Sequence, residues 1–169
     1  MTAPAARRVI FLDVDGVLNH AEAFKRWKQL FGTNVLDPDC ISNLVKLARS
    51  TGAEVVLSST WRLIGNAREL IRCVLWTHGV LILDQTPDLF GTTDGTVKPW
   101  SPPTRADEIR AWLDANKDVT HFVVIDDDSW ADIPGHFVQT DWELGPQGAG
   151  LTEAKAEDAR RILMGVEPA

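Results

Sequence analysis

The sequence predicts an α/β fold with a Rossmann-like, doubly wound parallel sheet of about five strands and helices on both faces. Short apolar runs alternate along the chain with amphipathic segments of helical periodicity, as in parallel α/β sheets. The apolar runs are continuous, which is typical of strands buried on both faces. Acidic or hydroxyl side chains follow three of these runs directly, and ligands bind beyond the carboxyl ends of strands in such sheets.

The first half of the chain supplies three strands and three helices. Residues 8–14 form an apolar run that predicts a buried strand, and residues 21–31 have the pattern of a short helix. Asp37 is expected to cap a second helix that ends at Gly52, because the apolar residues between them follow helical spacing. The other elements expected in this half are a strand at 54–58, a helix at 67–76 and a strand at 80–83.

The second half begins with an irregular segment. Glycine and proline recur at short intervals over residues 84–103, which indicates a loop. Thr104 is expected to cap a helix over residues 105–115, and Thr152 is expected to cap the last helix. Between these helices the apolar runs predict a strand at 121–125 and a weaker strand at 135–140.

Length and composition narrow the possible classes of protein. The 169 residues fit one domain over positions 1–169, and the 17 basic and 24 acidic residues give a net charge of −7. This charge excludes a pervasive basic face for nucleic acid, but it leaves room for a local basic groove. The 2 cysteines are too few for a disulfide framework. No apolar run is long enough to span a membrane and no signal-peptide layout is present, so a cytoplasmic protein without membrane contact is expected.

Carboxylate and hydroxyl side chains follow three predicted strands. Because these strand ends meet at one edge of the sheet, the acids should converge there, and a cation is needed to offset their repulsion. Mg²⁺ suits a site of oxygen ligands without histidine or cysteine. Each motif alone is commonly a turn or a helix cap, but their shared position indicates a site. The set comprises Asp13, Asp15 and Gly16 after the first strand, Ser58 and Ser59 after the second, and Asp126, Asp127 and Asp128 after the fourth.

Four stretches of sequence carry a family resemblance. They read FLDVDGVL at 11–18, VVLSS at 55–59, TRADEI at 104–109 and FVVIDDD at 122–128. In this order they resemble the haloacid dehalogenase (HAD) superfamily of aspartate-dependent phosphotransferases. The longer motifs FLDVDGVLN, SSTWR, R..EI.AWL, IDD and GLT are similar to small HAD phosphatase domains of nucleic-acid (RNA) repair proteins. The resemblance implies a HAD-like core with a minimal cap.

The resemblance implies a catalytic role for each matching position. Asp13 would be the nucleophile that forms an aspartyl-phosphate. Asp15 would be the general acid for the leaving oxygen and then the general base for the attacking water. Ser58 would hold the transferring phosphoryl group, and Ser59, Arg62 and the backbone at Gly16 are further candidates for substrate binding.

The same resemblance implies a Mg²⁺ site and a nearby cation. Asp126 would bind Mg²⁺ with the carboxylate of Asp13 and the backbone carbonyl of Asp15, and Asp127 would support the metal through water. Arg105 matches the basic residue of the third family motif, which is more often lysine. Lys98 and Arg62 remain alternatives for this cation. A phosphomonoester dianion needs both Mg²⁺ and such a cation before it can approach a carboxylate cluster.

Residues 19–36 are expected to form a small flap. The second helix belongs to a layer that covers the sheet, so these residues are what remains between the first two strands to serve as a cap. An open site suits a large substrate, such as a polynucleotide end, a phosphoprotein or a bulky nucleotide. Lys25, Arg26, Trp27 and Lys28 lie on this flap and could bind a strand by charge and stacking, although a solvated helix face has the same pattern. We expect a Mg²⁺-dependent phosphomonoesterase for polynucleotide 3′-phosphate ends or nucleotides, and a small-metabolite or phosphoprotein phosphatase is the alternative.

Two readings belong to other functional classes. A phosphoacceptor receiver domain also has an acidic Mg²⁺ site, with its acceptor aspartate at the end of the third strand, where this chain has Asp84. Its acid pair ends the first strand, however, whereas the consecutive acids of this chain follow the fourth. A catalytically inactive binding module is the second reading, and retention of every carboxylate argues against it. The sequence carries no feature that fixes an oligomeric state.

Overall fold

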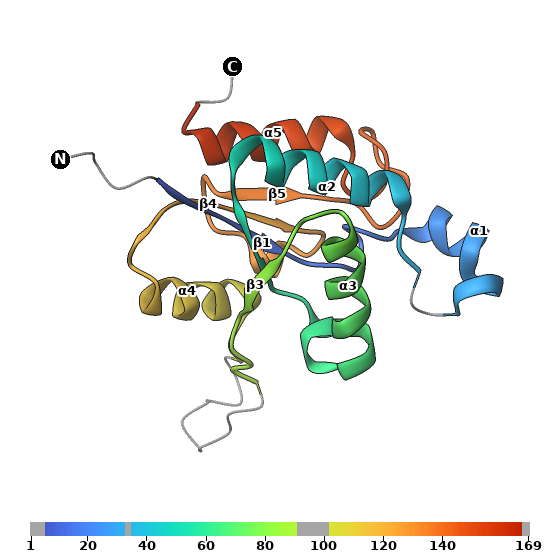
Figure 1. Cartoon of the computed structure of the whole chain (residues 1–169), viewed down its shortest axis with the longest axis horizontal. Helices are drawn as coiled ribbons and strands as arrows, with labels where there is room; N and C mark the ends of the chain where they lie inside the picture. The colour runs from blue at the N-terminus through green and yellow to red at the C-terminus, as the bar shows by residue number, and fades with distance from the viewer. Residues whose placement is uncertain (1–5, 33–34, 91–101, 167–169) are drawn as a thin grey trace.

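All five strands of the sheet run parallel. The computed structural model describes residues 6–32, 35–90 and 102–166, and Figure 1 shows the chain. Within these residues the strand order is β3-β2-β1-β4-β5. This order confirms that the strand leading to Asp13 is central and lies between those leading to Ser58 and Asp126. The strands are β1 (Arg7–Leu12), β2 (Glu54–Leu57), β3 (Ile82–Gln85), β4 (Val119–Asp126) and β5 (Phe137–Gln139).

Helices cover both faces of the sheet, because the central strand is apolar on both sides. Ile10 and Leu12 of β1 belong to the larger core, while Val9 and Phe11 belong to the smaller one. The larger core includes residues of α2 (Pro38–Thr51), α3 (Gly65–Thr77) and α5 (Glu153–Met164). The smaller core lies under α4 (Arg105–Ala115), on the opposite side of the sheet from the adjacent α2 and α5 (Figure 1). The predicted fold class is therefore confirmed.

The predicted caps lie at the starts of three helices. Asp37 accepts hydrogen bonds from the backbone amides of Asp39 and Cys40 at the start of α2. Thr104 forms a reciprocal capping box with Asp107 at the start of α4. Thr152 accepts from the amide of Lys155 in α5. Each cap satisfies amides that have no partner within the helix, so local sequence chemistry sets where these helices begin.

The helix α1 (Ala21–Phe31) projects from the edge of the sheet and does not join either layer (Figure 1). The chain leaves the core and returns to it at one point, where the amide of Asp37 donates to the carbonyl of Leu18 at 2.7 Å. The amide of Ala21 donates to the carbonyl of Trp142, and the rings of Phe24 and Trp142 lie 5.3 Å apart. The flap is thus a short excursion supported by the segment before α5.

Several element boundaries differ from the predicted ones. The third strand starts at Ile82 and not at residue 80, because the amide of Val80 bonds to the carbonyl of Leu75 and still closes the end of α3. Asp84 and Gln85 belong to β3 and not to the predicted loop, because they pair with Val56 and Leu57 of β2. Two short 3₁₀ turns, η1 (Thr60–Leu63) and η2 (Ser129–Ala131), also follow β2 and β4 without having been predicted.

Lys98 lies in the segment 91–101, outside the described residues. In the part of the chain that is described, no helix has the length and apolar character required to cross a membrane.

Candidate active site

The backbone pairing of the sheet continues one residue beyond β1 and β2 and thereby places the first side chains of the site. The amide of Asp13 donates to the carbonyl of Ile125 at 3.0 Å, and the amide of Ser58 donates to the carbonyl of Leu12 at 2.8 Å. These bonds link three adjacent strands at their carboxyl ends. The side chains that follow the strands therefore emerge from a rigid edge.

Asp13, Asp126 and Asp127 form the acid cluster of the site. One carboxylate oxygen from each lies within 4.8 Å of the others. Asp13 is 7% exposed and Asp126 is 3% exposed, so water screens their charges only weakly. Two oxygens bound to one Mg²⁺ at about 2.1 Å can lie up to about 4.2 Å apart. Small side-chain adjustments bring this all-oxygen donor set into that range, and it fits Mg²⁺.

Burial makes these carboxylates difficult to ionise when no cation is bound. Burial raises the pKa of Asp13 to about 7, against the opposing effects of the Ser59 hydrogen bond and the Arg105 charge. Burial and the charge of Asp13 raise the pKa of Asp126 to about 8. Burial also raises the pKa of Asp127. A bound divalent cation would favour the ionised forms of all three groups.

The carboxylate of Asp15 is fixed by two donors. The indole Nε1 of Trp61 donates to one oxygen at 2.9 Å, and the Nδ2 of Asn19 donates to the other at 2.8 Å. Asn19 is fully buried. Neither residue was among the predicted site residues, although both lie within the motifs FLDVDGVLN and SSTWR. Residue type alone gave no signal, because tryptophan and asparagine at these positions are also typical of packing and turns.

Gly16 permits the turn after Asp13 and Asp15 to approach the loop after β4 closely. Its φ of +74° is in the left-handed region, and a Cβ at this position would lie 2.3 Å from the carboxyl carbon of Asp127. Its amide donates to the Oδ1 of Asn19. A side chain would therefore displace Asp127 from the acid cluster. Its predicted part in substrate binding stays a prediction.

The two serines after β2 differ in their surroundings. The Oγ of Ser58 is buried and has no hydrogen-bond partner among the described residues. A buried hydroxyl without a partner is costly, and a phosphoryl oxygen at the cluster would supply one. The Oγ of Ser59 accepts from the amide of Trp61, and its hydrogen bond to Asp13 opposes the rise in that carboxyl pKa.

Arg105 and Arg62 take different positions relative to the acids. The Nε of Arg105 lies 3.8 Å from Asp126, and its side chain is 19% exposed at the site. Arg62 is 3% exposed, and its guanidinium donates to Glu108 at 2.7 Å and to the backbone carbonyls of Thr86, Ser59 and Pro87. Arg105 thus faces the acid cluster, whereas Arg62 holds the surrounding loops together.

Glu108 is a further residue that the sequence reasoning missed. It is 2% exposed, bonds to Arg62 and to the amide of Leu89, and lies 3.9 Å from Arg105. A signal was present, because Glu108 falls on the face of α4 that carries Ile109 and Trp112. A charged residue on an apolar face requires a buried partner.

Part of this set of side chains lines a cleft of about 410 Å³, whose described lining does not include Ser58 or Ser59. Its described lining includes Asp13, Asp15, Arg105, Asp126 and Asp127, together with Leu63, Phe90 and Trp130 at its mouth. The last three are 54%, 56% and 59% exposed. No described residue of α1 lines this cleft, so the structure does not bring Lys25, Arg26, Trp27 or Lys28 to it.

Asp84 lies apart from the acids. It is on the edge strand β3, and its carboxylate accepts from the indole Nε1 of Trp112 at 2.7 Å. A receiver domain requires its acceptor aspartate beside the metal-binding acids. The position of Asp84 does not meet this requirement, so the receiver interpretation is wrong.

The Arg62–Glu108 pair yields a prediction about stability. Glu108→Ala leaves the Arg62 guanidinium buried without its carboxylate, and we expect a loss of about 3–5 kcal/mol in the free energy of unfolding. Urea denaturation of the variant and the wild type measures this loss. Glu157→Ala is the matched control, because Glu157 pairs with Arg160 on the surface of α5 with both side chains about 40% exposed, and its effect should be much smaller. Equal effects would contradict the role of Glu108.

A comparison with protein families identifies the chain. Residues 9–156 match the family described as the HAD domain in Swiss Army Knife RNA repair proteins. The comparisons with curated proteins and with solved structures give no match. The matched residues include β2 to β5 and all of β1 except its first two residues. They also include the acids of the cluster and Arg105. The chain belongs to the family of HAD domains that occur in Swiss Army Knife RNA repair proteins.

Proposed function

We propose that the protein is a Mg²⁺-dependent phosphomonoester hydrolase that acts through an aspartyl-phosphate on polynucleotide ends, with 3′-phosphates preferred. The observation that carries this proposal is the convergence of Asp13 with Asp126 and Asp127 beside Arg105. The family match adds support, because HAD domains are hydrolases of a phosphatase-type superfamily and this family occurs in RNA repair proteins.

Three carboxylates would hold the metal. Asp13, Asp126 and Asp127 offer oxygens within 4.8 Å of one another, and the backbone carbonyl of Asp15 is the further ligand expected from the family motif. When bound, Mg²⁺ offsets negative charge on the phosphoryl oxygens. Arg105 would neutralise the remaining charge from the other side of the cluster, because its guanidinium lies 3.8 Å from Asp126.

In the first step an oxygen of Asp13 would attack the phosphorus atom. The bond from phosphorus to the leaving oxygen breaks as the bond to Asp13 forms. Asp15 would donate a proton to the leaving oxygen, which departs as an alcohol. Trp61 and Asn19 hold the Asp15 carboxyl in place from both of its oxygens, so they act as positioning residues for this proton transfer.

In the second step Asp15, now ionised, would take a proton from water. The water oxygen attacks the phosphorus atom of the aspartyl-phosphate, and the bond to Asp13 breaks. The products are inorganic phosphate, the free carboxylate of Asp13 and the protonated carboxyl of Asp15, so both residues return to their starting states. Ser58 supports both steps, because its buried hydroxyl has no described partner and is available to a phosphoryl oxygen.

The rim of the cleft supports a substrate with bases. Phe90 and Trp130 are more than half exposed at the mouth of the cleft, and exposed aromatic rings bind unpaired bases by stacking. Contacts with phosphate should be few, because the net charge is −7 and the described lining of the cleft contains more acidic than basic residues. Affinity for a strand would therefore depend on stacking more than on a long basic track.

The catalytic assignments predict distinct kinetic losses. Asp13→Asn removes the nucleophile, so turnover of p-nitrophenyl phosphate should fall by several orders of magnitude, while the fold persists because a buried charge is removed. Asp15→Asn should slow alkyl phosphates more than nitrophenyl phosphate, since a poor leaving group needs the proton most. Steady-state assays of phosphate release measure both. Equal losses of Asp15→Asn on the two substrates would contradict the role of Asp15. Activity of the wild type that survives EDTA would contradict the proposed dependence on a metal.

The raised carboxyl pKa values predict how stability depends on pH. Unfolded aspartates ionise near pH 3.8, whereas the folded protein without metal retains protons until about pH 7 at Asp13 and about pH 8 at Asp126. The folded state therefore binds more protons across this range, and the melting temperature of the metal-free protein should fall as pH rises through it. Mg²⁺ should raise the melting temperature more at about pH 8.5 than at about pH 5. Asp13→Asn is the control, and a pH dependence that it leaves unchanged would contradict this origin.

The aromatic rim predicts a separation between large and small substrates. Trp130→Ala should raise KM for 3′-phosphorylated oligonucleotides roughly tenfold through lost stacking and leave acetyl phosphate unaffected, because that substrate has no ring. The matched control is Trp76→Ala, since Trp76 is 67% exposed on α3 and lies outside the described lining of the cleft.

Two further outcomes of the same assay are informative. If a Lys25/Lys28 double alanine variant raises KM for oligonucleotides and Trp130→Ala does not, the strand binds on the flap and not at the rim of the cleft. Mononucleotides or phosphopeptides hydrolysed as well as oligonucleotides would replace the polynucleotide assignment with a small-molecule or phosphoprotein phosphatase.

A further inference from the structure

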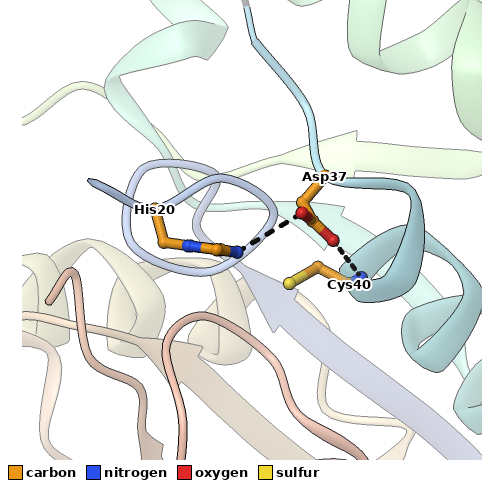
Figure 2. Close-up of side chains that lie close together, drawn as sticks. All are labelled: His20, Asp37 and Cys40. Atoms are coloured by element: carbon orange, nitrogen blue, oxygen red, sulfur yellow. Dashed lines mark hydrogen bonds and ion pairs between the residues drawn. The ribbon is translucent and has the colours of Figure 1, made fainter. Parts of the chain in front are cut away.

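His20, Asp37 and Cys40 form a second cluster of potential metal ligands at the base of α1. Figure 2 shows the three side chains directed toward one another, and one ligand atom from each lies within 4.8 Å of the others. Cys40 is 3% exposed and Asp37 is 7% exposed, while the side chain of His20 is 13% exposed. The three residues share none of the carboxylates of the acid cluster.

Three segments of the chain build this second cluster. His20 directly precedes α1, and Asp37 and Cys40 belong to the cap and first turn of α2. The third segment passes over them at Gly150, where a Cβ would lie 2.7 Å from the Sγ of Cys40 and 3.1 Å from the ring of His20. A side chain at position 150 would thus press on two of the three residues, and glycine keeps the space around them free.

The distances within the cluster fit two ligands of one ion better than a direct hydrogen bond. The Nε2 of His20 lies 3.4 Å from the Oδ2 of Asp37, which is longer than the usual 2.7–3.2 Å or so of a hydrogen bond. Two ligands at Zn²⁺ distances of about 2.0–2.2 Å in tetrahedral geometry lie about 3.3–3.6 Å apart. The Nδ1 of His20 is buried without a partner among the described residues, so no ordinary hydrogen bond holds the ring.

We propose that His20, Asp37 and Cys40 bind a Zn²⁺ ion. A thiolate and an imidazole select this class of metal over Mg²⁺, which prefers oxygen ligands. A cavity of about 370 Å³ adjoins the cluster and leaves room for water or another ligand at the fourth position. Glu22, Asp39 and Glu153 are also in the lining of this cavity, and these three acids outnumber its one described arginine, Arg26.

Binding would release one proton from the thiol. Burial raises the pKa of Cys40 to about 12, so the thiol is protonated before the metal arrives. The S–H proton passes to solvent as the bond from sulfur to Zn²⁺ forms, and His20 binds through a neutral ring nitrogen. No atom changes its oxidation state.

The ion would join the two ends of the flap. His20 stands at the start of residues 19–36, and Asp37 follows directly after their end. One ion bound by both residues and by Cys40 would fix the base of α1 to the first turn of α2. His20 also follows Asn19, which holds the carboxylate of Asp15 at 2.8 Å. The ion would therefore stabilise the loop that positions this acid.

Titration of the metal-free full chain with Co²⁺ tests the site directly, because a thiolate bound to Co²⁺ gives a charge-transfer absorption band that oxygen ligands do not. We expect one Co²⁺ ion with this thiolate band per chain. Zn²⁺ should displace it, and excess Mg²⁺ should not. Cys40→Ser should abolish the band, and His20→Ala should weaken Zn²⁺ binding by at least about tenfold. Circular dichroism establishes that each variant is folded.

Two controls separate this site from other metal binding. Cys73→Ser should keep the band, because Cys73 is an exposed free cysteine on α3. Asp13→Asn should also keep it, because that variant alters only the acid cluster. The proposal is overturned if the wild type shows no band, if folded Cys40→Ser retains it, or if Cys73→Ser loses it. If Cys40→Ser does not fold, an unchanged Zn²⁺ affinity in His20→Ala also overturns the proposal. The three residues are then only a helix cap beside a buried thiol.

Discussion

The repulsion between buried carboxylates at the carboxyl edge of the sheet is the constraint on which the rest of the site depends. Parallel pairing of β1 with β2 and β4 forces the residues after these strands into one small volume. Asp13 and Asp126 are nearly buried there, so their charges cannot be dispersed into water. Protonation, a bound cation or the charge of Arg105, which lies 3.8 Å from Asp126, can relieve this repulsion. The same carboxylates, together with Asp127, form an oxygen donor set that fits a divalent cation.

A second layer of buried polar contacts holds the first layer in position. Arg62 and Glu108 form a buried ion pair that also binds the backbone at Thr86, Pro87 and Leu89. This pair secures the segment that leads to Phe90 at the mouth of the cleft, and Glu108 lies near Arg105 as well. Asn19 and Trp61 perform the same task for Asp15. A buried ion pair of this kind contributes less to net stability than to a unique arrangement of loops.

The helix of the flap lies away from the cleft in this structure (Figure 1). The described residues of α1 do not line the cleft, and the helix rests instead on the segment near Trp142. Among the described residues, the exposed side chains of Leu63, Phe90 and Trp130 lie at the mouth of the cleft. An open cleft with an aromatic rim is compatible with the end of a long chain, whereas a small metabolite is normally enclosed on most sides. The proposed metal at His20, Asp37 and Cys40 would act on the base of the flap.

The sequence by itself determined the parallel α/β fold, the order of its elements and the acids of the site, because alternating apolar runs and residues at strand ends are local signals. It placed Asp37, Thr104 and Thr152 correctly as caps for the same reason. Only the tertiary structure distinguished Arg105, which faces the acids, from Arg62, whose guanidinium is buried against Glu108. It also decided that Asn19 and Trp61 hold Asp15, that Glu108 is paired within the core, and that α1 stands away from the cleft. The contacts of Trp61 with Asp15 and of Glu108 with Arg62 join residues distant in sequence, which local patterns do not specify, whereas Asn19 lies only four residues from Asp15.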